Sequence, residues 1–226
     1  MRTRDSIITM TVHGIGPAVR PLDPGEDRTW VSVEQFEHVL DTVVERDDVR
    51  ITFDDGNASD IEIALPRLLE RGLRAEFFVL AGLLGERGRL AEADVRELVK
   101  AGMRVGSHGW AHRDWRKIDH RQAVEELDAA HQRISRLSGH PVTRVAIPFG
   151  SYDRHVLRRL RQAGVTRAYT SNGDRARPDA WLQDRYTLWH DLDAKWTRQV
   201  LDGSPSLALR ARKTAGRAYK RWRGMP

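Results

Sequence analysis

Two groups of potential metal ligands each follow an expected strand of the chain. Asp54 and Asp55 follow the strand expected at 49–53, and His108 and His112 follow the strand expected at 103–106. Adjacent carboxylates repel each other unless they share a cation or a proton, so one of the two suits a metal ligand and the other a base. Imidazoles four residues apart reach the same side of a helical turn, where they can bind one ion.

These four side chains together predict metal-assisted hydrolysis of a carbonyl compound. One aspartate and two histidines make three protein ligands, which leave a coordination position open for water, as in catalytic zinc sites. The other aspartate can deprotonate that water. A simpler explanation exists for each motif, because Asp-Gly is a common turn sequence and a histidine pair with this spacing also arises by chance.

The elements that must position these side chains alternate along the sequence. A glycine separates an amphipathic helix from a short β-rich segment in the passages 67–80, 97–108 and 158–171. Further strands are expected at 7–12, 49–53, 145–147 and 187–189, and further helices at 33–45 and 121–137. This alternation predicts a parallel α/β architecture, either a barrel or an open sheet, with function at the carboxyl ends of the strands.

The composition predicts one globular domain followed by a basic tail. The chain has 226 residues, of which 40% are hydrophobic and 31% charged, enough for a single domain with a full core. It contains no cysteine, so His, Asp or Glu must bind any metal. Acidic and basic residues alternate up to about Asp202, whereas the segment from Arg210 to Arg223 has no acidic residue. We therefore expect a domain at 1–202 and a tail at 203–226.

The charge and the apolar segments also bear on location. No run approaches the roughly 18 apolar residues of a membrane span, and the stretch from Ile7 to Val12 is too short and too polar for a signal peptide. Together with the absence of cysteine, this predicts a cytoplasmic protein. The formal charge of +6 raises nucleic acid or anionic membrane as partners. Because the mixed charges of the domain are typical of a solvated surface, we expect no nucleic acid.

The basic tail is the candidate for membrane contact. As a helix it would align Leu207, Ala211 and Trp222 along one face and turn most basic residues outward. Such a segment binds an anionic membrane reversibly and in a salt-sensitive manner, which would place the protein at the inner membrane face. A disordered solubilising tail is the alternative.

Three motifs in this order resemble the polysaccharide deacetylase family. They are Thr52-Phe-Asp-Asp-Gly56, His108-Gly-Trp-Ala-His112 and Ile147-Pro-Phe-Gly150. The family includes the nodulation chitooligosaccharide deacetylases and the peptidoglycan N-acetylglucosamine deacetylases, and the resemblance extends from about Ile7 to Leu201. It implies a single domain with a distorted, incomplete (β/α) barrel.

The resemblance also implies roles for individual residues. Asp54 would be the catalytic base, and Asp55 would join the two histidines on one divalent ion, zinc by default, with cobalt or manganese able to substitute. The backbone N–H of Phe149, in a loop shaped by Pro148, would bind the oxyanion. His190 is the nearest match to the histidine that protonates the leaving amine.

The third motif departs from the pattern of the best-known family members. They have an arginine where this chain has Ala146, and that arginine steadies the base. Arg185, just before the last expected strand, is our candidate to replace it. His13 ends the first strand and is a further candidate for the site, although a structural histidine is the alternative. Aromatic side chains, Trp110 among them, are candidates to stack on sugar rings.

The implied reaction is hydrolysis of the N-acetyl group of an amino sugar, in an oligo- or polysaccharide or its lipid-linked precursor. The same centre would serve O-acetyl ester hydrolysis or hydrolysis of a small cyclic amide. A non-enzymatic alternative is a binding protein for glycan or nucleic acid, in which the absent arginine marks a loss of activity.

Overall fold

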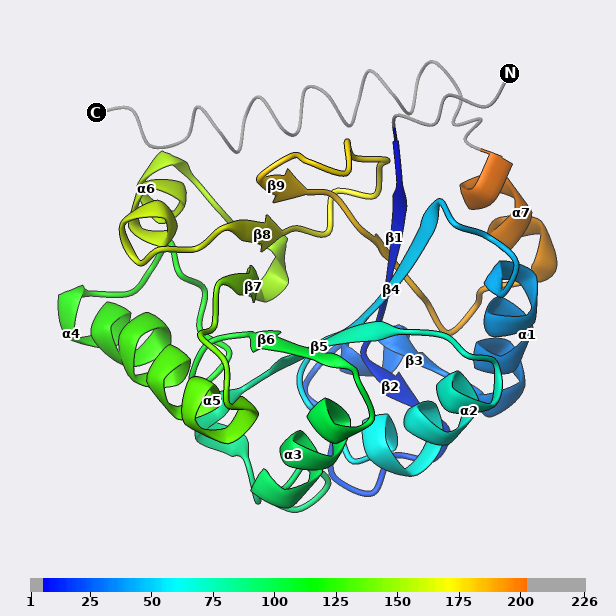
Figure 1. Ribbon diagram of the computed structural model, residues 1–226, viewed down its shortest axis with the longest axis horizontal. Helices are drawn as coiled ribbons and strands as arrows, with labels where there is room; N and C mark the ends of the chain where they lie inside the picture. Colours follow the sequence, from blue (N-terminus) through cyan, green and yellow to red (C-terminus); the bar gives the residue numbers. More distant parts are fainter. Residues whose placement is uncertain (1–5, 203–226) are drawn as a thin grey trace.

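The computed structural model describes residues 6–202, which form one curled parallel sheet with helices around its outer side (Figure 1). The eight strands follow the order β10-β1-β4-β5-β6-β7-β8-β9. Their bounds are Ile8–Val12 (β1), Val49–Phe53 (β4), Ala75–Val79 (β5), Arg104–Ser107 (β6), Arg144–Ala146 (β7), Arg167–Tyr169 (β8), Leu182–Gln183 (β9) and Tyr186–Thr187 (β10). This is the incomplete (β/α) barrel that the resemblance implies.

Helices lie between most of the successive strands up to β8, and the last helix follows the last strand. The α-helices are Val33–Val43 (α1), Leu65–Glu70 (α2), Glu92–Lys100 (α3), His120–Ala123 (α4), Ala130–Ser138 (α5), Arg154–Gln162 (α6) and Ala194–Asp202 (α7). Two segments are π-helical, Asp60–Ala64 and Val124–Ala129, and short 3-10 turns lie at Glu26–Thr29, Ala81–Leu83 and Pro148–Gly150. A small second sheet pairs Gly14–Ile15 (β2) with Trp30–Val31 (β3).

Local sequence accounts for where the elements begin and end. Helix α1 starts at a capping box in which the Ser32 hydroxyl accepts from Gln35 N, and the Gln35 side chain accepts from Ser32 N. The glycines that separate helix from strand in the three expected passages have positive φ, which glycine adopts without steric cost: Gly72 (63°), Gly102 (78°) and Gly164 (76°). The helix expected at 121–137 is a continuous run from His120 to Ser138 that includes the π-helical segment. Helix α7 is not among the elements that the sequence predicts.

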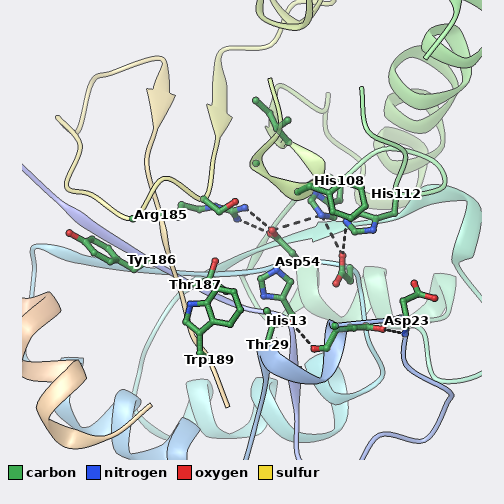
Figure 2. Close-up of a pocket in the computed structure, with 18 of the residues that line it drawn as sticks. His13, Asp23, Thr29, Asp54, His108, His112, Arg185, Tyr186, Thr187 and Trp189 are labelled. Atoms are coloured by element: carbon green, nitrogen blue, oxygen red, sulfur yellow. Dashed lines mark hydrogen bonds and ion pairs between the residues drawn. The ribbon is translucent and has the colours of Figure 1, made fainter. Parts of the chain in front are cut away.

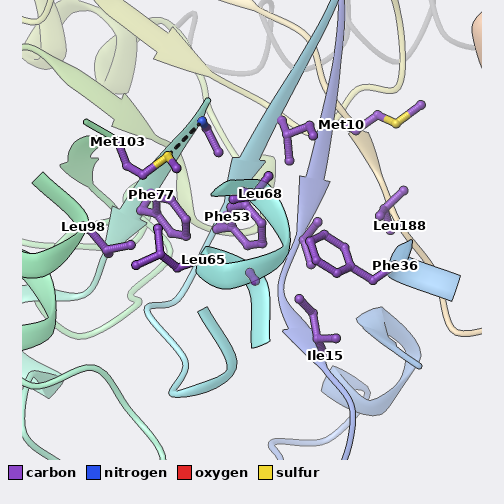
Figure 3. Packing of buried hydrophobic residues seen from close by; sticks show 14 of the residues in the cluster. Met10, Ile15, Phe36, Phe53, Leu65, Leu68, Phe77, Leu98, Met103 and Leu188 are labelled. Carbon is purple, nitrogen blue, oxygen red and sulfur yellow. Dashed lines mark hydrogen bonds between the residues drawn. The ribbon is translucent and has the colours of Figure 1, made fainter. Parts of the chain in front are cut away.

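The main core lies between the outer face of the sheet and the helices (Figure 3). Phe53 of β4 stacks on Phe77 of β5 with ring centroids 4.4 Å apart, and Phe36 of α1 meets Phe53 edge-on at 6.0 Å. Because side chains alternate along a strand, Phe78 points to the inner face of the curl, where it packs against Tyr169 of β8. The sheet thus has a thick apolar outer layer and a small inner one, and the inner one lies beneath the site described next.

The two edge strands, β9 and β10, do not pair with each other, so the barrel is not closed. Strands β9 and β10 are consecutive in the chain but lie at opposite ends of the sheet. Asp184 and Arg185, the residues between them, must therefore cross from one edge of the sheet to the other. No helix within residues 6–202 combines the length and the apolar character that crossing a membrane requires.

Candidate active site and metal centre

The carboxyl ends of the parallel strands bring the candidate residues to one cavity of about 730 Å³ (Figure 2). His13 follows β1, Asp54 and Asp55 follow β4, and His108 follows β6. Phe149, which follows β7, also lines the cavity. This volume lies within the range of roughly 300–1,000 Å³ that is usual for small-molecule sites.

Asp55, His108 and His112 form a group that fits one divalent ion. Their nearest side-chain nitrogen and oxygen atoms lie within 4.8 Å of one another. Asp55 Oδ1 is 3.4 Å from His108 Nε2 and 3.7 Å from His112 Nε2. Ligand atoms at zinc bond lengths on a tetrahedron are separated by about 3.4 Å. Asp55 Oδ1 is buried and has no hydrogen-bond partner among the described residues, so an ion here would satisfy it.

A backbone contact orients His108 as a ligand. Its Nδ1 lies 2.8 Å from the carbonyl oxygen of Ala146, to which the protonated nitrogen donates. Nε2 then carries the lone pair and faces Asp55. The Ala146 position therefore contributes its carbonyl oxygen to the site.

The charges of the group also favour a cation. Burial would raise the pKa of Asp55, but the neighbouring imidazoles hold it well below its usual range. Burial would likewise lower the pKa of His108, but Asp54 and Asp55 raise it, so this position attracts positive charge. Burial lowers the pKa of His112 to about 4, which keeps that imidazole in the neutral form that binds metal.

Asp54 is ion-paired with Arg185 beneath this group. The guanidinium donates to Asp54 Oδ1 at 2.7 Å and to Oδ2 at 2.6 Å, and Arg185 is only 1% exposed. It also donates to Thr52 Oγ1 and to the carbonyl of Thr170. Burial would raise the pKa of Asp54, but Arg185 lowers it below the ordinary value. Asp54 is thus anionic, and His108 Nε2 lies 3.9 Å from its Oδ2.

Phe149 lies at the rim of the cavity in a strained turn. The residue is 63% exposed, and its ring lies 4.3 Å from that of His112, measured between centroids. The turn is packed closely, since a Cβ on Gly150 would lie 2.1 Å from Ser171 Oγ. Within residues 6–202, three residues other than glycine have positive φ: Asp55 (73°), His112 (55°) and Phe149 (59°). All three line this cavity, where such strain commonly concentrates.

Comparison with known proteins identifies the family of this chain. The sequence profile of the family described as polysaccharide deacetylase matches residues 42–168, more than half of the chain. The chain belongs to the polysaccharide deacetylase family.

Individual relatives are distant. YxkH of Bacillus subtilis, named as a polysaccharide deacetylase, is 25% identical over 140 residues, covering 62% of this chain and 49% of YxkH. The peptidoglycan-N-acetylmuramic acid deacetylase PdaC of the same species is 29% identical over 103 residues, covering 45% of this chain and 21% of PdaC. The chain thus spans about half of the first relative and about a fifth of the second.

A solved structure shows the same fold. The deacetylase PplD of Streptococcus pyogenes, in complex with acetate, superposes with a TM-score of 0.76 at 17% identity. The match covers 88% of this chain and 99% of the PplD chain.

His190 does not join the other candidate residues at the cavity. Its side chain is exposed, its Nδ1 lies 3.2 Å from the carbonyl oxygen of Arg28, and it does not line the cavity. Leu188 points into the core and Trp189 lines the cavity. The next residue, His190, is therefore directed away from the site, and the expectation that it faces the leaving group is wrong.

Two further expectations are corrected. Trp110 packs away from the cavity, with Arg133 Cζ 5.8 Å from its ring centroid and Gly82 so close that a Cβ there would lie 2.4 Å from the indole nitrogen. It therefore cannot stack on a substrate sugar. His108 and His112 also do not lie on a helical turn, because the chain between β6 and α4 forms a loop.

The cavity contains residues that the sequence did not single out. Trp189 is 43% exposed and Trp196 extends from α7, so one wall is aromatic. Arg89 lines another wall and donates from Nη1 to Asn57 Oδ1 at 3.0 Å. An exposed tryptophan directly after buried Leu188 at a strand end was the signal available for Trp189. Arg89 had none, because it lies in a loop remote from the motifs.

Proposed function

We propose that this protein removes N-acetyl groups from an amino-sugar oligo- or polysaccharide, or from its lipid-linked precursor, with one divalent ion, zinc by default. The proposal rests on one arrangement above all. A buried carboxylate ion-paired with Arg185 lies beside three side chains that fit a single metal ion. Membership in the deacetylase family supplies the reaction class.

In this proposal Asp54 is the base. Arg185 keeps it anionic despite burial, so it can accept a proton from the attacking water. The chemistry that zinc supplies in such a site is Lewis acidity and a more acidic water ligand. Asp55, His108 and His112 would bind the ion. The backbone N–H of Phe149 would donate to the oxyanion that develops on the acetyl carbonyl.

His13 takes the place of His190 as the proposed proton donor. It lines the cavity, and its Nδ1 is buried without a hydrogen-bond partner among the described residues. A histidine suits proton transfer near neutral pH. It would give a proton to the nitrogen as the C–N bond breaks, leaving free amine and acetate.

A panel of acetylated glycans tests this function. Acetate release should occur with N-acetylated amino sugars, stop after treatment with a chelator and return on addition of zinc. Equal or faster release from O-acetylated sugars, or hydrolysis of a small cyclic amide alone, would replace the proposal by one of those activities. Absence of any metal-dependent turnover would instead favour a glycan-binding protein.

Membrane contact through the basic tail is also a proposal. Residues 203–226 lie outside the described part of the chain, so it depends on the sequence of basic residues without acidic ones from Arg210 to Arg223. A lipid-linked substrate at the inner membrane face would bring such a segment close to anionic lipids.

A further inference from the structure

The loop that carries His108 and His112 has an irregular backbone. Gly109, directly after the first histidine, has φ of 94°, and His112 has φ of 55°. The two imidazole centroids are 5.0 Å apart across this loop. A left-handed conformation at a residue with a side chain persists only where the surroundings hold it.

The carboxylate of Glu126 lies at the centre of this loop. It is fully buried and accepts from two consecutive backbone groups, Trp110 N to Oε2 and Ala111 N to Oε1, each at 3.0 Å. Trp115 Nε1 also donates to Oε2 at 3.1 Å, and Arg113 donates to Oε1 at 3.0 Å. Each oxygen therefore has two donors, so the loop is folded around a fully satisfied carboxylate.

The surrounding backbone leaves room for this carboxylate. A Cβ on Gly109 would lie 2.3 Å from Glu126 Oε2, so a larger residue there would displace it. Glu126 extends from the π-helical segment Val124–Ala129 between α4 and α5. Such π-helical turns are rare and frequently occur at functional sites.

We propose that Glu126 is a positioning residue that fixes the spacing of the His108 and His112 imidazoles and thereby the affinity and geometry of the metal site. The backbone N–H groups that donate to Glu126 belong to Trp110 and Ala111, which lie between the two histidines in the chain. Loss of these hydrogen bonds would let the imidazoles move relative to each other. The proposal rests on the proposed metal site for its effect on binding. The hydrogen bonds from the loop to the Glu126 carboxylate involve protein atoms alone.

The test compares Glu126→Gln with Glu125→Gln in the full chain. Glutamine has about the size of glutamate, but its NH₂ group would face two of the four groups that donate hydrogen bonds to the Glu126 carboxylate. Glu125 also pairs with Arg113 but accepts from no backbone N–H of the loop, so its variant is a matched control.

We expect the Kd for Zn²⁺ to rise about 10- to 100-fold in Glu126→Gln. The control should stay within about fivefold of wild type. The visible absorption spectrum of the Co²⁺-substituted protein should change in Glu126→Gln alone.

Amide hydrogen exchange in the metal-free protein gives a second readout. Trp110 and Ala111 should be protected in wild type and in Glu125→Gln, and should lose protection in Glu126→Gln. Fast exchange of both amides in wild type would overturn the inference without any substitution, as would a Glu126→Gln protein with wild-type Zn²⁺ affinity and Co²⁺ spectrum. A wild-type protein that binds no metal but protects both amides would overturn the proposed metal site and support the positioning of the loop by Glu126.

Discussion

At the scale of single residues, the proposed chemistry depends on the charge of Asp54. A carboxyl group this deeply buried would ordinarily favour its neutral form. The paired hydrogen bonds from Arg185 reverse that preference and lower the pKa of Asp54. Arg185 lies between β9 and β10, whereas the best-known family members have their arginine at the position of Ala146. The same buried charge is thus compensated by a different segment.

Replacement of Arg185 by glutamine should therefore shift the pH dependence of catalysis. Without the guanidinium, burial dominates and the pKa of Asp54 rises. The base then becomes protonated at higher pH, so the acidic limb of the kcat/KM profile should move upward. Arg185→Lys, which keeps the charge, should shift it less, and zinc content should be unchanged in both. An acidic limb at the wild-type position would show that Arg185 does not set the charge of Asp54.

At the scale of elements, regular structure follows from the sequence far better than loop geometry does. The strand expected at 49–53 matches β4 in full, because Val49, Ile51 and Phe53 are β-branched or aromatic residues at alternate positions, a pattern typical of a strand. The loop around His108 and His112 could not be derived locally, since its shape depends on Glu126 in the following helix. His190 was misplaced for a similar reason. The direction of each side chain after β10 is set by packing of Leu188 against the core.

Helix α5 carries a buried histidine that should make stability depend on pH. Burial lowers the pKa of His131 to about 4, below its usual value near 6.5. Between these values the unfolded chain binds a proton that the folded protein does not, so the free energy of unfolding should fall as pH drops. The loss should be about 3 kcal/mol from pH 7 to pH 4. Denaturant unfolding of wild type and His131→Leu across this range measures it. If the free energy of unfolding fell equally with pH in the two proteins, His131 would not be the cause of the fall.

At the scale of the whole molecule, the gap in the barrel is part of the site. Because β9 and β10 occupy opposite edges, the two-residue link between them bridges the open side of the curl, and its Arg185 reaches Asp54 from there. Its guanidinium lies over Phe78 and Tyr169, with Cζ 5.5 and 5.6 Å from the ring centroids. Strand order of this kind depends on pairing between distant segments. The alternating elements therefore predicted an α/β fold from the residues alone, whereas the family resemblance was needed to choose the incomplete barrel.

The basic tail gives a prediction for the full chain. Each basic residue near an anionic surface contributes on the order of 1 kcal/mol, and salt screens the attraction. Full-length protein should float with anionic liposomes at low salt and be released at high salt, while a chain that ends at Ser206 should stay behind. Equal flotation of both forms, or of neither, would remove the tail from the proposed mechanism.

The central proposal assigns different tasks to two adjacent aspartates, and one paired measurement tests it most directly. Zinc content and acetate release should be determined on the same preparations of wild type, Asp54→Asn and Asp55→Asn. We expect Asp54→Asn to retain stoichiometric zinc and to lose about 10²- to 10⁴-fold in turnover, the usual contribution of a general base. Asp55→Asn should lose zinc. Loss of zinc from Asp54→Asn with retention by Asp55→Asn would show that the two roles are exchanged, and full activity of either variant would contradict the proposed mechanism.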